Sequence, residues 1–555
     1  MKDEIPRQLE ARRGFSVFYR GKTLLSLIDP ISQGDRLAAS VLQRSRTLYF
    51  CPSPLYGYGL LKLLEGLCAN SAVLCVETDE KLMALSCAAM EKSPGDHPRL
   101  RFIRTRDAAA LCAFVRKTWG SRTFRRLEVV RLSGGWQLDA PGYETLAAAL
   151  RRDIALDWGN AMTLVKLGRR YIRNALRNLV LIPSAPTLQD LSFGSRPVLV
   201  LGAGPSLDGV LDGLLSAFGD GLKQGAGRPF VLISVDTGLS ALVSRNIKPD
   251  LVVALESQHW NLRDFIGSGA WEVPVAMDLS ALPATREVLG GHTFLFVTPW
   301  APLRLFDRLR DAGLLPGTLP PLGSVGLTAV ALALRTSSGP VITGGIDFSF
   351  TQDRFHARNT PGHLESLRRH NRLGGLIGAA AFRPGVFTAR SKSGEPVLCD
   401  PAMKNYRELF EQEFSREKRL ADISGTGLPL GIETLSPATA FARLRDGGTA
   451  AAGRVPDRPA ELVEKRRQAL KALIYRERDL LDTLRNILTG KIPSPPGETE
   501  KLLDETDYLW AHFPDCAGTG GRRPPGTDIS FLKRVRTELD PFIRIFDLLI
   551  RDLDC

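Results

Sequence analysis

The sequence of 555 residues has no Cys-x-x-Cys motif, no long apolar run and only seven histidines. Cys51 and Cys75 lie inside apolar segments, where a reduced cysteine behaves as a small hydrophobic side chain, and this usage favours a reducing compartment. No stretch approaches the 18 uninterrupted apolar residues of a membrane span, and the charged N-terminus lacks an apolar signal segment. These absences predict a cytoplasmic protein without a membrane span.

The sequence also lacks a dense basic run, although its net charge is +13. Its arginines are scattered and aromatic residues are not interleaved with them, so solvated helix faces explain the charge better than a nucleic-acid site. We therefore expect no nucleic-acid partner, while the positive field remains favourable for an anionic nucleotide.

The length and a composition that is 44% hydrophobic and 24% charged indicate a soluble globular protein with several domains. We predict an α/β fold, in which a doubly wound, mostly parallel central sheet is preceded by a smaller Rossmann-like α/β domain and followed by a helical tail. The predicted boundaries are 1–140 for the Rossmann-like domain, 141–190 for a helical bridge, 191–446 for the central nucleotide-binding domain, 447–460 for a linker and 461–555 for the helical domain.

The first domain has the order of a dinucleotide site but only part of its chemistry. A strand at 47–51 leads to a loop with Gly57 and Gly59, and a strand at 71–77 ends in Glu77, where an acid can bind ribose hydroxyls. Because the third glycine is missing, we interpret the site as vestigial and expect it to serve packing or partner contact.

In the central domain, apolar strands alternate with helices, which predicts a doubly wound sheet. The predicted strands are Val198–Leu201, Phe230–Val235, Leu251–Leu255, Val273–Met277, Phe294–Val297 and Val341–Thr343. Ligands of such sheets bind beyond the carboxyl ends of the strands, so residues just past those ends are candidates for the site.

The first of these strands runs into Gly202-Ala-Gly204-Pro205-Ser206. Glycines at this place let the backbone approach a phosphate, and the following helix adds a favourable field for an anion. Ser206 is predicted to cap that helix with its hydroxyl. A plain strand-to-helix turn explains the loop about as well.

Three acids follow other strand ends, namely Asp236, Glu256 and Asp347. Each alone is typical of a turn or a helix cap. Together with a phosphate loop at the same sheet edge they indicate one site, in which they either hold a divalent ion or bind ribose hydroxyls. No Asp-x-Asp motif stands at these ends.

Two histidines, His356 and His363, lie in the loop after Asp347. A histidine placed above a nucleotide can remove a proton from an acceptor hydroxyl, whereas the alternative is an ordinary exposed loop residue. Their irregular spacing and the lack of a third ligand argue against zinc. The absence of Gly-x-Ser-x-Gly argues against a serine hydrolase.

These residues resemble the motility-associated-factor family of flagellin glycosyltransferases, whose wider group includes 6-hydroxymethylpterin diphosphokinase-like proteins. The motifs that carry the resemblance are Gly202-Ala-Gly-Pro-Ser-Leu207, Asp236 with Ile247-Lys-Pro-Asp250 and Glu256, Gly323-Ser324, and Gly345-Ile-Asp347-Phe with His356. It covers most of residues 15 to 445. The central block is also similar to bacterial sialyltransferases.

The resemblance implies that Gly204, Pro205 and Ser206 lie against a cytidine nucleotide, and that Gly323 and Ser324 lie near its ribose or phosphate. In those sialyltransferases the base is a histidine in the loop after Gly-Ile-Asp-Phe, so the resemblance implies His356 or His363 as the base. We take His356 as the base and Asp347 as the second catalytic candidate. Glu256 stands where many relatives carry Asp.

The expected function is transfer of a nonulosonic, sialic-acid-like sugar from a CMP-sugar donor to Ser or Thr of flagellin, with no resident cofactor. One alternative is a pterin diphosphokinase that uses ATP and Mg²⁺. Another is a non-catalytic motility assembly factor with a residual nucleotide site.

Overall fold

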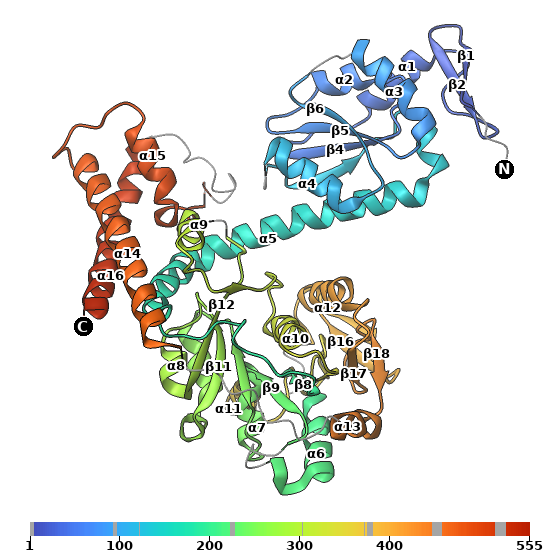
Figure 1. Cartoon of the computed structure of the whole chain (residues 1–555). Coiled ribbons are helices and arrows are strands. Elements are labelled where there is room, and N and C mark those ends of the chain that lie inside the picture. The colour runs from blue at the N-terminus through green and yellow to red at the C-terminus, as the bar shows by residue number, and fades with distance from the viewer. Residues whose placement is uncertain are drawn as a thin grey trace. The chain divides into compact units, whose positions relative to one another are not determined.

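The computed structural model describes residues 5–92, 97–120, 123–222, 228–301, 303–370, 372–373, 381–446, 458–514, 516 and 529–554. The chain forms two compact units. The first unit comprises Met1–Gly168 and Leu509–Lys533, and the second comprises Arg169–Tyr508 and Arg534–Cys555 (Figure 1). Most of the predicted linker at 447–460 lies outside the described residues, so the finer domain boundaries stay predictions.

The first unit is built on a four-stranded parallel sheet in the order β6-β5-β4-β7. Its strands are β4 (Thr47–Pro52), β5 (Ala72–Glu77), β6 (Leu100–Arg104) and β7 (Arg126–Val129), and helices α2 (Leu60–Glu65), α3 (Glu80–Lys92) and α4 (Ala108–Trp119) connect them. Every residue of β4 and β5 is buried, as their unbroken apolar sequence predicts.

A small antiparallel sheet precedes this core, with strands β1 (Arg7–Glu10), β2 (Phe15–Tyr19) and β3 (Lys22–Thr23). β2 and β3 form a hairpin that turns at Arg20 and Gly21. The next helix, α1 (Pro30–Ala39), begins after Asp29, whose carboxylate accepts a hydrogen bond of 2.9 Å from the Ser32 N–H.

The segment predicted as a helical bridge is one continuous helix, α5 (Ala140–Asn178), followed by a short turn of 3-10 helix at Leu179–Leu181. Its first part belongs to the first unit and its residues from Arg169 onward to the second. In the second unit, Asn174 and Asn178 donate side-chain hydrogen bonds to four backbone carbonyls of the loops after the sheet strands.

The second unit contains a nine-stranded parallel sheet in the order β13-β12-β11-β10-β9-β8-β14-β17-β18. The strands are β8 (Val198–Leu201), β9 (Val231–Val235), β10 (Leu251–Ala254), β11 (Val273–Asp278), β12 (Gly290–Val297), β13 (Gly317–Thr318), β14 (Val341–Gly344), β17 (Leu420–Ile423) and β18 (Glu433–Leu435). The six predicted strands are all present, and the parallel order confirms the predicted fold class.

Helices cover both faces of this sheet, because its strands are apolar on both sides. Val198 and Val200 of β8 pack in one core with α10 (Val325–Thr336) and α12 (Pro401–Phe414). Leu199 and Leu201 pack in the other core with α6 (Leu207–Phe218), α7 (Leu239–Val243) and α13 (Pro437–Arg445).

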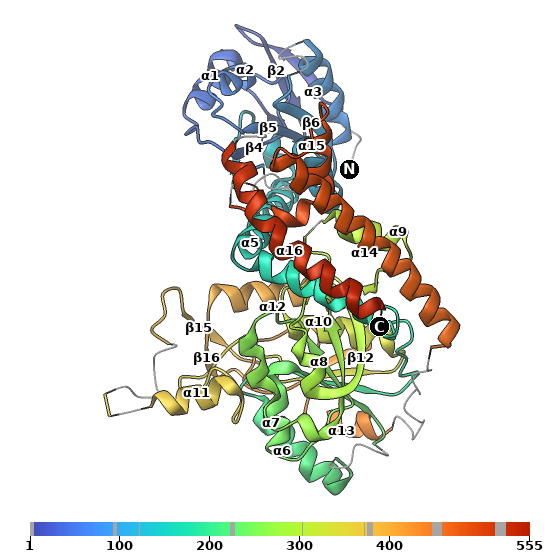
Figure 2. The same cartoon turned by 90° about the vertical axis from the view of Figure 1, so that its left-hand side faces the viewer.

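The predicted helical tail is present as α14 (Ala460–Leu488), α15 (Glu498–Glu505) and α16 (Ile529–Asp554). α14 and α16 run alongside each other (Figure 1 and Figure 2), and Arg478 of α14 pairs with Asp547 of α16 at 2.6 Å. Of the helices in the described ranges, none combines the length and the apolar character needed to cross a membrane.

Buried charges attach the tail within the second unit. The fully buried Glu477 of α14 pairs with Arg308 of α9 (Arg304–Asp311) and accepts a 3.1 Å hydrogen bond from the Tyr508 hydroxyl. Asp507 accepts the Arg304 N–H at 3.0 Å and thereby caps the start of α9. The tail is therefore anchored by groups that lose solvation and must keep their partners.

Candidate functional site

The strand order reverses direction between β8 and β14. From β8 the chain winds outward through β9 to β13, and β14 then returns to the opposite side of β8. Such a reversal leaves a crevice at the carboxyl ends of the two strands, which is where open α/β sheets bind ligands. The glycine loop follows β8 and Asp347 follows β14, so the sequence prediction that both lie at one sheet edge is confirmed.

Both glycines of the first loop are required by close packing. A methyl group added at Gly202 would lie 2.4 Å from the Gly345 carbonyl oxygen, and one added at Gly204 would lie 2.5 Å from Oδ2 of Asp347. The N–H groups of Gly202 and Gly204 donate to the carbonyls of Gly344 and Gly345, each at 2.8 Å. These two N–H groups are therefore occupied within the protein, which agrees with the plain-turn interpretation of the loop.

Asp347 binds the end of this loop with both carboxylate oxygens. The Ser206 N–H donates to Oδ2 at 2.7 Å and the Ser206 hydroxyl donates to Oδ1 at 2.5 Å. Ser206 does occupy the N-cap position of α6, but its side chain makes no capping hydrogen bond, so the predicted capping hydroxyl is wrong. The hydroxyl is instead oriented toward the carboxylate, to which it donates a charge-assisted hydrogen bond. With 3% of its surface exposed, Asp347 positions the loop.

A second glycine segment, Ser424–Leu428, reaches the same place from β17. A methyl group at Gly425 would lie 2.9 Å from Cβ of Ser206, and one at Gly427 would lie 2.6 Å from Oδ1 of Asp347. The Leu428 N–H donates to the Asp347 carbonyl at 2.8 Å. The predicted site residues did not include this segment, although its Gly-x-Gly after an apolar strand repeats the signal of the first loop.

A buried ion pair lies behind the second glycine segment. Lys392, in the turn between β15 (Phe387–Arg390) and β16 (Pro396–Cys399), pairs with Asp422 at the end of β17. The Thr343 hydroxyl donates to Asp422 at 2.8 Å. Burial raises the pKa of Asp422 to about 6, although Lys392 opposes this shift. No sequence pattern indicates that a hairpin lysine pairs with this acid.

The loop that carries the histidines lies directly on the first glycine loop. The Ala357 N–H donates to the Ala203 carbonyl at 3.0 Å, which places His356 beside the crevice. Burial, together with the nearby charge of Arg383, lowers the pKa of His356 to about 4. The imidazole is therefore neutral at pH 7 and can accept a proton.

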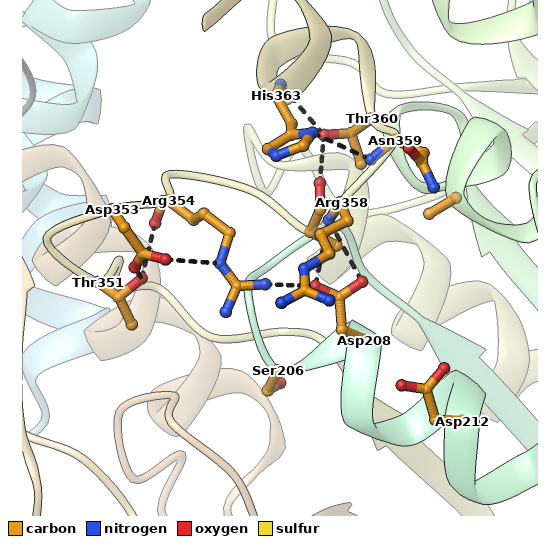
Figure 3. A network of polar contacts seen from close by, with 12 residues as sticks. Ser206, Asp208, Asp212, Thr351, Asp353, Arg354, Arg358, Asn359, Thr360 and His363 are labelled. Atoms are coloured by element: carbon orange, nitrogen blue, oxygen red, sulfur yellow. Dashed lines mark hydrogen bonds and ion pairs between the residues drawn. The ribbon is translucent and has the colours of Figure 1, made fainter. Parts of the chain in front are cut away.

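Asp208, in the first turn of α6, holds this loop in place (Figure 3). Its carboxylate pairs with Arg354 at 2.6 Å and with Arg245 at 3.1 Å, and it accepts the Arg358 N–H at 3.2 Å. His363 lies at the far end of the network, where its Nδ1 accepts the Asn359 N–H at 3.2 Å. Of the two histidines, His356 is next to Ala357, which is hydrogen-bonded to the glycine loop, whereas His363 contacts Asn359.

The predicted acids Asp236 and Glu256 lie at the ends of β9 and β10. Asp236 accepts hydrogen bonds from the Thr237 N–H at 2.8 Å and from Asn261 at 3.0 Å, and burial raises its pKa to about 6. Asn261 also donates to Asp264 at 2.8 Å; burial and the charge of Asp236 raise the pKa of Asp264 to about 7. Oε1 of Glu256 accepts the Gln258 N–H at 3.0 Å.

Within the described part of the chain, no group of three His, Cys, Asp or Glu side chains could hold a metal ion. The carboxylate of Asp347 is bound to Ser206, while Asp236 belongs to the cluster with Asn261 and Asp264. A divalent-ion role for Asp236, Glu256 and Asp347 stays a prediction of the kinase alternative.

Gly323 and Ser324 immediately precede α10. Gly323 has a φ of +69°, a conformation that side-chain-bearing residues rarely adopt, and its Cα faces the ring of Tyr406. Ser324 is half-buried at the N-cap of α10, and its side chain makes no capping bond. Nucleotide binding by these residues and by Gly202, Gly204, Pro205 and Ser206 stays a prediction.

In the first unit, the acid at the end of β5 is bound by protein groups. Glu77 is fully buried and accepts hydrogen bonds from Ser53 and Tyr143, both at 2.8 Å, as well as from the Thr78 N–H at 3.0 Å. A methyl group at Gly135 would lie 2.2 Å from Oγ of Ser53, so the chain packs closely beside the end of β4. The vestigial site stays an interpretation of the sequence.

The glycines of the N-terminal loop have a packing role as well. A methyl group at Gly59 would lie 2.3 Å from the Gly34 carbonyl oxygen, and one at Gly34 would lie 2.5 Å from the Tyr58 backbone. Gly34 belongs to α1, so the glycines allow that helix and the loop to cross in backbone contact.

Comparison with known proteins agrees with this description. Residues 169–353 match the family model described as 6-hydroxymethylpterin diphosphokinase MptE-like. An uncharacterized protein of Treponema pallidum (strain Nichols) is 29% identical over 573 residues, which covers 99% of this chain and 96% of that protein. The solved structure of MAf glycosyltransferase from Magnetospirillum magneticum AMB-1 is similar with a TM-score of 0.51 and 15% identity, covering 100% of this chain and 93% of that one. The resemblance to the motility-associated-factor glycosyltransferases is thus supported by a domain match and by the fold.

Proposed function

We propose that this chain, which has an MptE-like domain and the fold of a MAf glycosyltransferase, transfers a nonulosonic sugar from a CMP-sugar donor to Ser or Thr of flagellin. The single observation that carries the proposal is the convergence of two glycine segments and the His356 loop at the β8–β14 reversal. Gly204 and Gly427 both abut the carboxylate of Asp347, and Ala357 is hydrogen-bonded to Ala203.

The chemistry follows from this arrangement. The acceptor oxygen attacks the anomeric carbon while the bond from that carbon to the phosphate oxygen breaks, and CMP leaves with the bonding electrons. His356 takes the proton of the acceptor hydroxyl as a neutral imidazole; its low pKa keeps it neutral at pH 7 and makes it a weaker base than an ordinary histidine. Ser324 and the start of α10 contact the ribose or phosphate in this proposal, and the helix N-terminus favours the charge of the departing phosphate.

Asp347 and Asp208 act through other groups. Asp347 fixes Ser206 and the two glycine segments, and Asp208 fixes the loop that carries His356. Both are positioning residues in this mechanism because their carboxylates are bound by protein partners.

A thermal-shift panel tests the donor: CMP, CDP, S-adenosylmethionine, and ATP with and without Mg²⁺. A ligand at 100 times its dissociation constant stabilises the native state by about 2.7 kcal/mol, which is enough to move a melting curve. A shift with CMP that needs no Mg²⁺ and weakens in Ser324→Ala supports the proposal.

The alternative functions predict different results in the thermal-shift panel. A shift only with ATP and Mg²⁺ would favour the diphosphokinase that the matching family model describes. A chain that responds to none of these ligands fits a non-catalytic assembly factor. Transfer that persists in His356→Ala would remove the proposed base from the mechanism.

A further inference from the structure

The helix after the His356 loop, α11 (Pro361–Arg369), has no buried residue. Leu364 and Leu367 are 38% and 44% exposed, and their spacing of three places them on one face. The helix is held at its start by the Thr360 hydroxyl, which accepts the His363 N–H, and midway by Glu365, which pairs with Arg263 at 3.0 Å. Polar contacts therefore hold the helix in place, and the described core does not cover its apolar face.

A second uncovered apolar element lies in residues 381–390. Phe382 is 86% exposed and Phe387, the first residue of β15, is 40% exposed. Between them, Arg383 stacks on the ring of Phe355 with its guanidinium carbon 5.1 Å from the ring centre. Phe355 in turn contacts His356, with ring centres 5.0 Å apart.

α11 meets the same histidine. A methyl group added at Gly362, in the first turn of α11, would lie 2.9 Å from Nδ1 of His356. The helix and the 381–390 segment therefore both adjoin the candidate base, and each carries exposed apolar side chains.

Positive charge predominates on this surface. α11 and residues 381–390 carry four arginines, Arg368, Arg369, Arg383 and Arg390, and a single acid, Glu365. That acid is already paired with Arg263 and Arg369. A partner that is both acidic and apolar fits such a surface, because it pairs the arginines while it covers the leucines and phenylalanines.

We propose that α11 and residues 381–390, here called the acceptor surface, dock the protein substrate. The docked segment combines acidic and apolar side chains around its Ser or Thr, and its hydroxyl reaches His356. This inference rests on the proposed transfer reaction and adds to it the place and chemistry of acceptor recognition. A protein segment fits better than a lipid surface, since a flat bilayer does not deliver a hydroxyl to a half-buried histidine.

The test measures binding of purified flagellin monomer from the same organism to the full chain by biolayer interferometry. We expect Leu364→Asp/Leu367→Asp to lower the affinity at least tenfold, because apolar anchors at an interface carry most of its binding energy. Phe382→Ser, at a side chain that is 86% exposed, should weaken binding without any effect on folding. Leu462→Asp is the matched control, since Leu462 is a 42% exposed leucine on α14, outside the acceptor surface.

Unchanged binding by both acceptor-surface variants would overturn the proposal, as would a wild-type chain that binds no flagellin. Vesicles containing phosphatidylglycerol form the third arm, and binding to them that the variants abolish, without flagellin binding, would assign the surface to lipid instead. Donor binding is measured separately through the CMP thermal shift, which the acceptor-surface variants should leave unchanged. A failed CMP shift rejects the donor, whereas failed flagellin binding rejects the acceptor surface.

Discussion

The packing of Gly204 against Asp347 makes a quantitative prediction for Gly204→Ala. The new methyl group would lie 2.5 Å from Oδ2 of Asp347 and 2.7 Å from its Cγ, which no real contact tolerates. Asp347 cannot rotate away, because Gly427 abuts its other oxygen and Ser206 donates two hydrogen bonds to it. The variant must therefore either shift the loop or break those bonds.

The magnitude follows from the two routes. Overpacking of a core costs typically about 1–3 kcal/mol, and each hydrogen bond to a charged group contributes about 1.5–3 kcal/mol. We expect Gly204→Ala to destabilise the second unit by about 3 kcal/mol. The entropy of unfolding grows with the number of residues, so for a unit of this size 3 kcal/mol lowers the melting temperature by roughly 4 °C.

Gly209→Ala provides the control within the same strand-to-helix connection. Gly209 lies in α6, where an added methyl group meets nothing within 4 Å. Alanine is favoured over glycine inside a helix by about 1 kcal/mol, so this variant should be slightly more stable than the wild type. Both are measured by urea unfolding. Stability of Gly204→Ala within 0.5 kcal/mol of the wild type, about the size of a surface substitution, would refute the packing argument.

Three further predictions concern charge. Burial raises the pKa of Asp507 from its ordinary 3.8 to about 7, so the folded state binds this proton more tightly than the unfolded state. The free energy of unfolding should therefore fall as pH rises from about 4 to 7. In urea unfolding at a series of pH values, Asp507→Asn should remove this decrease. Glu477→Gln leaves Arg308 buried beside a neutral group and should destabilise the chain by about 3–5 kcal/mol, whereas the double variant Glu477→Leu/Arg308→Met should be less destabilised than the single one in the same unfolding assay. Because the pKa of His356 is lowered to about 4, its imidazole stays neutral above pH 5, and the transfer rate should show no acid limb between pH 5 and 8; a limb near pH 6.5 that His356→Ala removes would contradict this.

The strand ends of the central sheet could be predicted because buried parallel strands leave an unbroken apolar pattern. Apolar runs such as Val198–Leu201 fixed the strands, and the alternation with helices fixed their direction. The place of Gly202 and Asp347 at one edge followed from that topology alone.

What the sequence could not show was which polar groups satisfy one another. Ser206 is a residue type that often caps helices, but its hydroxyl donates a hydrogen bond to Asp347, which lies 141 residues later in the chain. The Lys392–Asp422 pair and the packing of Gly425 on Ser206 likewise depend on contacts between distant segments. Pattern and propensity are local, and these choices are made by tertiary packing.

In the N-terminal domain, the sequence pattern resembles a binding site, but the acid of that pattern is bound by protein groups. Gly57, Gly59 and Glu77 stand in the order of a dinucleotide site, yet Glu77 is enclosed by Ser53 and Tyr143. Only the missing third glycine hinted that the loop serves packing.

The separation of Ser206 and Asp347 along the chain has a consequence for synthesis on the ribosome. The partner of the Ser206 N–H is made 141 residues after it, which corresponds to about 7–28 s at ordinary rates of translation. Until β14 has paired with β8, the first glycine loop lacks both the carbonyls and the carboxylate that hold it. A nascent chain therefore has no preformed crevice until β14 has been made and has paired with β8.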